Sequence, residues 1–361
     1  MIIGSISENK ELEKRISITP DLAKKYISNG FEVLIEKNFS SHIGISDDKF
    51  TEQGCKIESK ENILKKSDII LQLDLPEEKN LEFFNENKIL IGNFNSNQNL
   101  EKIAKFKPNK NSIFSLELLP RITRAQSMDI LSSQANLAGY KAVIDSFAEF
   151  KKAIPMMMTA AGTISAAKVL VVGAGVAGLQ AIATAKRMGA IVFATDVRMA
   201  SKEQVESLGG KFLVVEGSEN LETEGGYAKE ASEEFKKKQE NLLAENLKKI
   251  DIVICTALIP GKKAPLIIKD KMIDDMQAGS VIYDLAASQG GNAAYTKVDE
   301  VVNKNGVTIL GDKNILNKLP VSASNLYAKN LFNFVLNLYD KKNNNININL
   351  EDEIINKTLV K

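Results

Sequence analysis

The chain has 361 residues, of which 44% are hydrophobic and 26% are charged, and these proportions are typical of a soluble globular protein with roughly two domains. Lysine and arginine number 47 against 46 aspartate and glutamate residues, so no overall field favours nucleic acid or an anionic membrane. The balance of charge argues against nucleic acid as a partner.

The amino terminus, Met1 to Ser5, lacks the basic region and apolar core of a signal peptide, and no uncharged apolar run approaches the ~20 residues that cross a bilayer. We therefore expect a cytoplasmic chain with no direct membrane insertion. Cys55 and Cys255 have no paired spacing, which favours two reduced, buried side chains. His42 is the single histidine and lies in a turn of small residues, so we predict no metal site.

In the first third of the chain, short apolar runs alternate with polar stretches of helical character. This alternation predicts an α/β sheet with strands at residues 32–35, 68–71, 88–92 and 112–115. Residues 127–152 have apolar side chains at helical spacing and no proline, so we expect a long connecting helix that Pro155 closes.

A glycine motif follows the apolar run at residues 169–172 and is typical of a dinucleotide-binding βαβ unit. Gly173 permits the tight turn, Gly175 lets the backbone approach a pyrophosphate, and Gly178 lets the helix pack on the sheet. The amino terminus of that helix then faces the phosphates with unpaired N–H groups.

A second apolar run, residues 190–195, carries Asp196 to its end. A carboxylate at this position accepts hydrogen bonds from an adenosine ribose and repels a 2′-phosphate, which predicts NAD(H) over NADP(H). Arg198 is discordant, because a nearby arginine can accommodate the extra phosphate of NADP(H).

Four further apolar runs predict strands of the same lobe, at residues 211–215, 251–255, 279–284 and 307–310. Residues 322–339 then form an amphipathic helix that can return to the first lobe. We predict a first lobe of residues 1–133 with 320–361 and a second lobe of residues 134–319. The predicted fold class is α/β, with two doubly wound Rossmann-like lobes joined by long helices and the cofactor in the cleft between them.

Three segments carry no decisive pattern. Residues 156–162, rich in methionine, are interpreted as flexible core filling before a buried strand. Residues 341–347, rich in asparagine and lysine, are interpreted as a solvated, mobile tail. Residues 216–249 are charged, with a Gly225-Gly226 hinge and Tyr227 at the tip; spacing alone favours a surface loop and a solvated helix over a lid that closes on nucleotide.

Residues 121–132, Arg-Ile-Thr-Arg-Ala-Gln-Ser-Met-Asp-Ile-Leu-Ser, resemble the NAD(H)-binding component of proton-translocating NAD(P) transhydrogenases. The resemblance covers nearly the whole chain and includes residues 137–140, 156–162, 173–178, 196–198, 225–228, 256–261 and 284–286. Residues 352–360 are similar to the point where the family's NAD domain stops before its membrane part. The resemblance therefore implies the separate first section of the alpha subunit of a three-subunit enzyme.

The resemblance implies a catalytic loop containing Arg121, Gln126, Asp129 and Ser132, which lies over the nicotinamide and holds its carboxamide. Hydride transfer between two nicotinamides needs placement rather than a proton donor or a metal. Gln126 is expected near the nicotinamide ribose and the facing cofactor, and Tyr140 as a brace of the loop. From Arg121 and Asp129 alone, an ion pair at a helix start is an equal alternative. The cofactor-contacting positions that the resemblance implies, beyond the three glycines, are Gln126, Ser127, Met128, Asp129, Val176, Asp196, Val197, Arg198, Gly226, Tyr227, Gln239 and Leu258, of which Gln239 and Leu258 rest on the resemblance alone.

The resemblance also implies partners. The chain holds one glycine motif and no second one, so NADP(H) is expected on an NADP-binding beta subunit, with a membrane-spanning alpha-2 subunit passing protons. NADH bound here would deliver its hydride directly to NADP⁺ on the partner. A homodimer is expected, peripherally associated with the inner membrane through these partners.

Alanine dehydrogenase is the nearest rival, since it shares the two-lobe plan and the early motif at residues 13–20. Those enzymes use a lysine near Gln72 and a histidine near residues 92–97, and neither is present here. Amine oxidation requires removal of a proton, so their absence weakens the rival and makes Arg15 a structural residue. Ser288 and Ala293 depart from the transhydrogenase pattern around the Gly-Gly-Asn turn. A redox-sensing module without turnover also stays open, although residues 121–132 argue against it.

Overall fold

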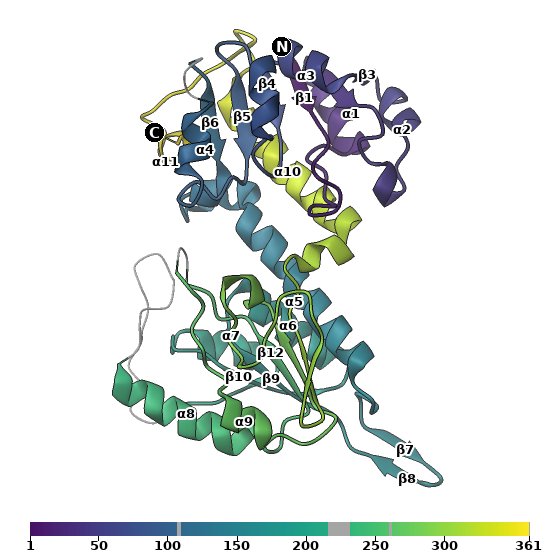
Figure 1. The fold of residues 1–361 in the computed structure, drawn as a ribbon, viewed down its shortest axis with the longest axis vertical. Coiled ribbons are helices and arrows are strands. Elements are labelled where there is room, and N and C mark those ends of the chain that lie inside the picture. Colours follow the sequence, from purple (N-terminus) through teal and green to yellow (C-terminus); the bar gives the residue numbers. More distant parts are fainter. Residues whose placement is uncertain (107–109, 216–231, 260–261, 361) are drawn as a thin grey trace. The chain divides into compact units, whose positions relative to one another are not determined.

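The structure is a computed structural model that describes residues 1–106, 110–215, 232–259 and 262–360. The chain divides into two compact units, Met1–Gln134 with Leu316–Lys361 and Ala135–Ile315. Each unit is built on its own sheet, which is parallel in the first unit and parallel except for one edge strand in the second, and the predicted α/β class with two doubly wound sheets is confirmed (Figure 1). No helix among the described residues is long and apolar enough to cross a membrane.

The first unit has a six-stranded parallel sheet in the order β3-β2-β1-β4-β5-β6. Its strands are β1 (Ile2–Ser5), β2 (Glu32–Glu36), β3 (Lys56–Glu58), β4 (Ile69–Leu71), β5 (Ile89–Gly92) and β6 (Ser112–Ser115). Its helices are α1 (Pro20–Ser28), α2 (Asp47–Thr51), α3 (Lys60–Lys66), α4 (Leu100–Ala104), α10 (Pro320–Leu338) and α11 (Glu353–Thr358). The strands β2, β4, β5 and β6 confirm the predicted runs, whereas β1 and β3 were missed because they are short and partly polar.

Side chains alternate between the two faces of this sheet, as the period of a strand requires. Val33 and its neighbours of the same parity pack with Tyr26 of α1 and Phe334 of α10. Leu34 lies on the opposite face, where the core includes Ile63 of α3. Helices on both faces make this a doubly wound unit.

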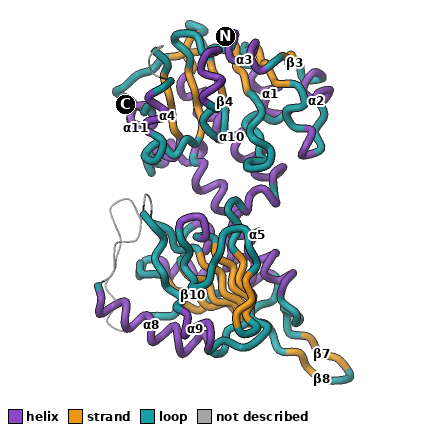
Figure 2. The backbone as a smooth tube through the Cα atoms, in the orientation of Figure 1, coloured by secondary structure: helices purple, strands orange, loops and turns teal. Residues whose placement is uncertain are grey.

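The second unit has a seven-stranded sheet in the order β11-β10-β9-β12-β13-β15-β14, in which only β14 is antiparallel to its neighbour. Figure 2 shows strands of this sheet side by side in orange around the label β10. Its strands are β9 (Lys168–Val172), β10 (Ile191–Thr195), β11 (Lys211–Phe212), β12 (Ile252–Cys255), β13 (Val281–Asp284), β14 (Val302–Lys304) and β15 (Val307–Leu310). Its helices are α6 (Val176–Arg187), α7 (Ser201–Ser207), α8 (Glu233–Leu247) and α9 (Asp270–Asp274), and α5 (Ile130–Glu149) crosses the boundary between the two residue ranges. The order places a topological switch point between β9 and β12, where such sheets bind ligands at the carboxyl ends of their strands.

The methionine-rich segment differs from its predicted role as core filling. It forms a hairpin of β7 (Met157–Thr159) and β8 (Gly162–Ile164), and all six strand residues are exposed. Met158 is 80% exposed, and Gly162 closes the turn at φ +134°. Figure 1 shows the hairpin projecting from the second unit. The prediction was wrong because hydrophobic composition without a clear period does not distinguish a buried run from an exposed hairpin.

The segment interpreted as a mobile tail is solvated but folded. A short hairpin pairs β16 (Tyr339–Asp340) with β17 (Asn345–Ile346), and the Asp340 carboxylate accepts the backbone N–H of Lys342. The chain then continues into α11, which buries Ile354 in the first core. Cys55 and Cys255 are buried and unpaired, as predicted.

Candidate functional site

The first turn after β9 has the geometry that the glycine motif predicts. Gly173 adopts φ +93°, which favours glycine, and its N–H donates to the carbonyl of Thr195 in β10 at 2.8 Å. A Cβ on Gly178 would lie 1.9 Å from the Gly173 carbonyl oxygen, so only glycine lets α6 start this close to the strand. These two glycines shape the turn itself.

Gly175 has a different role from its neighbours. It precedes the first residue of α6 with φ −76°, and a Cβ built on it would meet no atom within 4 Å. The first hydrogen bond of the helix runs from the Leu179 N–H to the carbonyl of Gly175. The backbone N–H groups of residues 176–178 therefore have no acceptor within the helix. Open space beside unpaired amides at a helix amino terminus suits a phosphate group. Val176, at the start of the helix, is 40% exposed.

Asp196 lies just beyond β10, and its carboxylate folds back on the glycine turn. Oδ2 accepts the N–H of Ala174 at 2.6 Å, and Oδ1 accepts the N–H of Arg198 at 2.8 Å. The Arg198 guanidinium also contacts both carboxylate oxygens at 2.9 Å. The Asp196 and Arg198 side chains are 6% and 16% exposed, so this ion pair is largely shielded from water. Asp196 therefore braces the turn and is partly neutralised by Arg198.

Thr256 begins the turn after β12 and touches the glycine turn from the other side. Its N–H donates to Val172 at 2.8 Å, and its hydroxyl donates to the Gly173 carbonyl at 2.9 Å. Leu258, two residues on, is 42% exposed. Gln239 is partly buried on α8, and Val197 is partly buried between Asp196 and Arg198. Gly226 and Tyr227 lie outside the described residues.

The predicted nicotinamide loop belongs to the first unit and leads into α5. A short 3-10 helix spans Thr123–Met128, and Asp129 then caps α5. The Asp129 carboxylate accepts the Ser132 N–H at 2.9 Å and the Ser132 hydroxyl at 2.5 Å. The structure therefore brings Asp129 and Ser132 together as a helix cap, and the ion pair of Asp129 with Arg121 stays an alternative prediction.

The other loop residues divide by exposure. Arg121, Gln126 and Ser127 are exposed, whereas Met128 is 6% exposed and packs in the core of the first unit. The Met128 side chain therefore anchors the loop to the core of the first unit, and its contact with a cofactor stays a prediction. The Ser127 carbonyl accepts the side-chain amide of Asn330 of α10 at 2.9 Å. This anchor could not be predicted from the sequence because Asn330 lies 203 residues from Ser127.

Gln72 and Arg15, the two positions that bear on the alanine dehydrogenase alternative, are both engaged by neighbouring groups. The Gln72 oxygen accepts the Ile6 N–H at 3.0 Å, and its nitrogen donates to Glu8 at 2.9 Å. The Arg15 guanidinium donates to the Glu13 carboxylate, with a shortest distance of 2.6 Å, and to Gln134 at 2.9 Å. These contacts fit the structural role predicted for Arg15.

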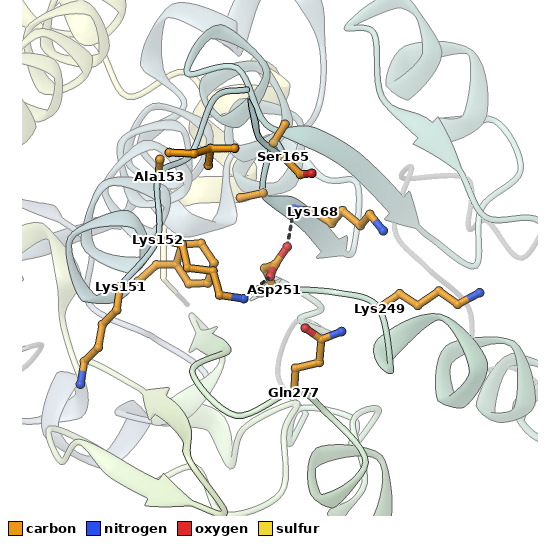
Figure 3. Close-up of a pocket in the computed structure, with 12 residues that line it drawn as sticks. Lys151, Lys152, Ala153, Ser165, Lys168, Lys249, Asp251 and Gln277 are labelled. Atoms are coloured by element: carbon orange, nitrogen blue, oxygen red, sulfur yellow. Dashed lines mark hydrogen bonds and ion pairs between the residues drawn. The ribbon is translucent and has the colours of Figure 1, made fainter. Parts of the chain in front are cut away.

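A cavity of about 560 Å³ lies at the amino ends of β9 and β12, where Lys152, Lys168 and Lys249 are among its lining residues (Figure 3). Asp251 accepts the Lys168 N–H at 2.9 Å and pairs with the Lys152 amino group at 3.6 Å. Because the glycine turn follows the carboxyl end of β9, this cavity is not the predicted nucleotide site. Among the described residues, no group of three or more histidine, cysteine, aspartate or glutamate side chains is placed to hold a metal ion.

Family models match the chain in two sections, the alanine dehydrogenase/PNT N-terminal domain over residues 4–138 and the C-terminal domain over residues 142–361. The first part of the NAD(P) transhydrogenase alpha subunit of Rhodospirillum rubrum is 47% identical over 368 residues, covering 100% of this chain and 96% of that protein. Alanine dehydrogenase 1 of Staphylococcus aureus is 26% identical over 348 residues, covering 94% and 88%.

The crystal structure of transhydrogenase from Sinorhizobium meliloti superposes with a TM-score of 0.89 and 42% identity, covering 100% of this chain and 98% of that one. The fold and the glycine turn are consistent with the family that these similarities indicate. The chain belongs to the alanine dehydrogenase/PNT family and, within it, to the proteins related to the first part of the NAD(P) transhydrogenase alpha subunit.

Proposed function

We propose that this chain is the NAD(H)-binding component of a proton-translocating NAD(P) transhydrogenase and passes the hydride of NADH to NADP⁺ held by a partner subunit. The observation that carries the proposal is the space at Gly175, where a Cβ would meet nothing within 4 Å at the amino terminus of α6. A turn shaped by Gly173 and Gly178 but left open at Gly175 fits the pyrophosphate of a dinucleotide.

The residues of the second unit bind and orient in this proposal. The amides at the start of α6 receive the pyrophosphate, and the Asp196 carboxylate receives the adenosine ribose. Arg198 holds that carboxylate in place, while Leu258, Val176 and Gln239 remain proposed contacts. NADH, when bound, supplies the hydride.

The residues of the first unit position the nicotinamide in this proposal. Asp129 and Ser132 form one hydrogen-bonded pair at the start of α5, and Arg121 and Gln126 are exposed on the preceding loop. A carboxylate fixed by a helix cap can hold a carboxamide with little loss of freedom on binding. Positioning of this kind lowers a barrier by up to roughly 7–11 kcal/mol when reactants are well aligned.

Alanine dehydrogenase activity is the second candidate, since the family models and a 26% identical relative bear that name. The chemistry of the chain disfavours it. Oxidation of an amine needs a group that takes a proton. The single histidine, His42, is exposed with its ring bonded to the Lys14 carbonyl at 2.8 Å, and Gln72 is bonded to Ile6 and Glu8.

The proposed partners follow from the names of the relatives, which describe the first part of a divided alpha subunit. We propose an NADP-binding beta subunit as hydride acceptor, a membrane-spanning alpha-2 subunit for proton passage, and a peripheral position on the cytoplasmic side of the inner membrane. A homodimer is also proposed. The hairpin of β7 and β8 supports association with another chain, because an isolated two-stranded hairpin is marginally stable in water.

The test is the rate of hydride transfer from NADH to an acetylpyridine analogue of NADP⁺, followed by absorbance with and without the NADP-binding subunit. Transfer that requires the partner supports the proposal. Reduction of NAD⁺ by alanine with this chain alone, and no transfer with the partner, would replace it with the second candidate. Tight NADH binding with neither reaction would favour a redox-sensing module.

A further inference from the structure

A buried polar network lies beyond the carboxyl ends of β12 and β13, at the same edge of the sheet as the glycine turn. Asp284 ends β13, and Asn292 follows after the Gly290-Gly291 turn; both side chains are 0% exposed. Buried polar groups persist where their hydrogen bonds are satisfied. The contacts of these two residues therefore show what the network holds in place.

The Asn292 side chain pairs with the backbone of the turn after β12. Its oxygen accepts the Ala257 N–H at 2.9 Å, and its nitrogen donates to the Ala257 carbonyl at 2.8 Å. The same nitrogen donates to the Pro265 carbonyl at 2.9 Å. Just beyond the end of β12, the Asn292 amide thus forms the pair of hydrogen bonds that a neighbouring strand would form. It fixes Ala257 through both the N–H and the carbonyl of Ala257.

Ala257 lies between Thr256, which contacts the glycine turn, and Leu258, a proposed nucleotide contact. Thr256 precedes it and donates to the Gly173 carbonyl at 2.9 Å. Leu258 follows it with an exposed side chain. A Cβ on Gly173 would lie 2.8 Å from the Thr256 hydroxyl, so the two turns are in close contact. A shift of Ala257 would displace both neighbours.

Asp284 holds Asn292 in turn. Its Oδ2 accepts the N–H of Asn292 at 2.7 Å and of Ala293 at 3.0 Å, and the hydroxyl of Thr296 at 2.8 Å. Gly291 adopts φ +78°, and a Cβ there would lie 3.0 Å from Asp284 Oδ2. The turn wraps the carboxylate closely, so the orientation of Asn292 is set by the main chain and not only by its side-chain bonds.

We propose that Asn292 is a positioning residue of the nucleotide site, which fixes residues 256–258 against the glycine turn and thereby sets the affinity for NAD(H). The inference rests on the proposed function. Asn292 touches neither the substrate nor the reacting atoms. It acts through Thr256 and Leu258.

The experiment titrates NADH by fluorescence into the full chain and into Asn292→Ala, at a temperature where circular dichroism shows both folded. The alanine leaves the Ala257 N–H and carbonyl without their partners, so the Kd for NADH should rise about tenfold or more. Met272→Ala is the matched control. Met272 lies in the core of the same unit and makes no hydrogen bond to these turns, so its loss should lower the melting temperature and leave the Kd unchanged.

Asn292→Asp adds a readout that a merely structural role would not move. A carboxylate cannot donate to Ala257 or Pro265, so NADH binding should be weak at pH 8. At lower pH a protonated carboxyl regains one donor, so the Kd of Asn292→Asp for NADH should recover towards that of the unsubstituted chain. The Kd of the unsubstituted chain should vary less over the same pH range.

The outcomes separate the two proposals. If the unchanged chain does not bind NADH, the proposed function fails and this inference fails with it. If the unchanged chain binds NADH but Asn292→Ala binds it equally well, or Asn292→Asp shows no recovery at low pH, the positioning role alone is overturned.

Discussion

The two sheets share a strand order around their first strand but differ at the carboxyl end of that strand. In the second unit, β9 runs through a short glycine turn directly into α6, and the space beside Gly175 stays open. In the first unit, β1 is followed by a long loop, and the Ser5 hydroxyl bonds to Ser17 at 2.5 Å and to the Leu71 carbonyl at 2.8 Å. The Gln72 side chain adds a bond to the Ile6 N–H at the same strand end.

This difference explains why we propose a nucleotide site in the second unit only, although the two units have the same strand order around their first strand. Topology places the ends of the central strands together in both units, but a ligand needs space and unpaired donors there. In the first unit, the Ile6 N–H just beyond β1 donates to the Gln72 side chain. In the second unit, we propose that the amides at the start of α6 bind a ligand.

The largest effect on NADH binding should come from a side chain that fills the open space beside Gly175. Gly175→Ile adds a side chain whose Cβ would meet no protein atom, at φ −76°, which any residue adopts. The free energy of unfolding should therefore change by about 1 kcal/mol or less, while NADH binding falls below detection in a fluorescence titration. Gly178→Ala is the contrast, because its Cβ would lie 1.9 Å from the Gly173 oxygen and should unfold the turn. Unchanged NADH affinity in Gly175→Ile would contradict the proposed phosphate position.

The second-largest effect is expected on the rate of hydride transfer rather than on the affinity for NADH. Asn caps helices about as well as Asp, so Asp129→Asn should keep the bond to the Ser132 N–H and the start of α5. It removes the carboxylate charge, and hydride transfer with the partner subunit should fall roughly 10–100-fold, about 1.4–2.7 kcal/mol, while the Kd for NADH stays largely intact. Stopped-flow absorbance measures the transfer. Full activity would limit Asp129 to a capping role.

A smaller effect tests how Arg198 shapes nucleotide choice. Arg198 neutralises Asp196, so Arg198→Ala should expose the carboxylate to a 2′-phosphate and weaken NADPH binding more than NADH binding, by several-fold. Paired titrations give the ratio of the two Kd values. Asp196→Ala is the companion variant, and it should weaken NADH binding because the ribose and the Ala174 N–H both lose an acceptor. NADPH binding as tight as that of NADH by the unchanged chain would refute the predicted preference.

The sequence predicted these features where cause and effect are neighbours in the chain. The turn role of Gly173 and the packing role of Gly178 could be predicted because a strand and the helix after it fix both roles locally, whereas the ribose contact of Asp196 stays a prediction. Asn292 and Gln72 could not, since their partners are 35 and 66 residues away and only the folded sheets bring them together. The hairpin at residues 157–164 was misjudged for a related reason, because the burial of a methionine depends on what packs against it.

The smallest effect concerns the loop that follows β1 in the first unit. Burial raises the pKa of Glu8 to about 8 from 4.5, opposed by the Leu73 N–H and increased by Asp74 and Glu13. The folded chain therefore keeps a proton that the unfolded chain releases between about pH 4.5 and 8, so stability should fall as pH rises through that window and stay low above it. The partial exposure of this residue reduces the effect.

Glu8→Gln cannot ionise, yet its side-chain oxygen can still accept the Leu73 N–H, which Glu8 does at 2.7 Å. At pH ~9 this variant should be more stable than the unchanged chain by about 1–3 kcal/mol, and near pH 4.5 the two should unfold at the same urea concentration. Glu11→Gln, at an exposed position of the same loop, should follow the unchanged chain at both pH values. Parallel pH profiles for Glu8→Gln and the unchanged chain would mean that Glu8 is ionised in the folded state, and that the loop closing the end of β1 tolerates the charge.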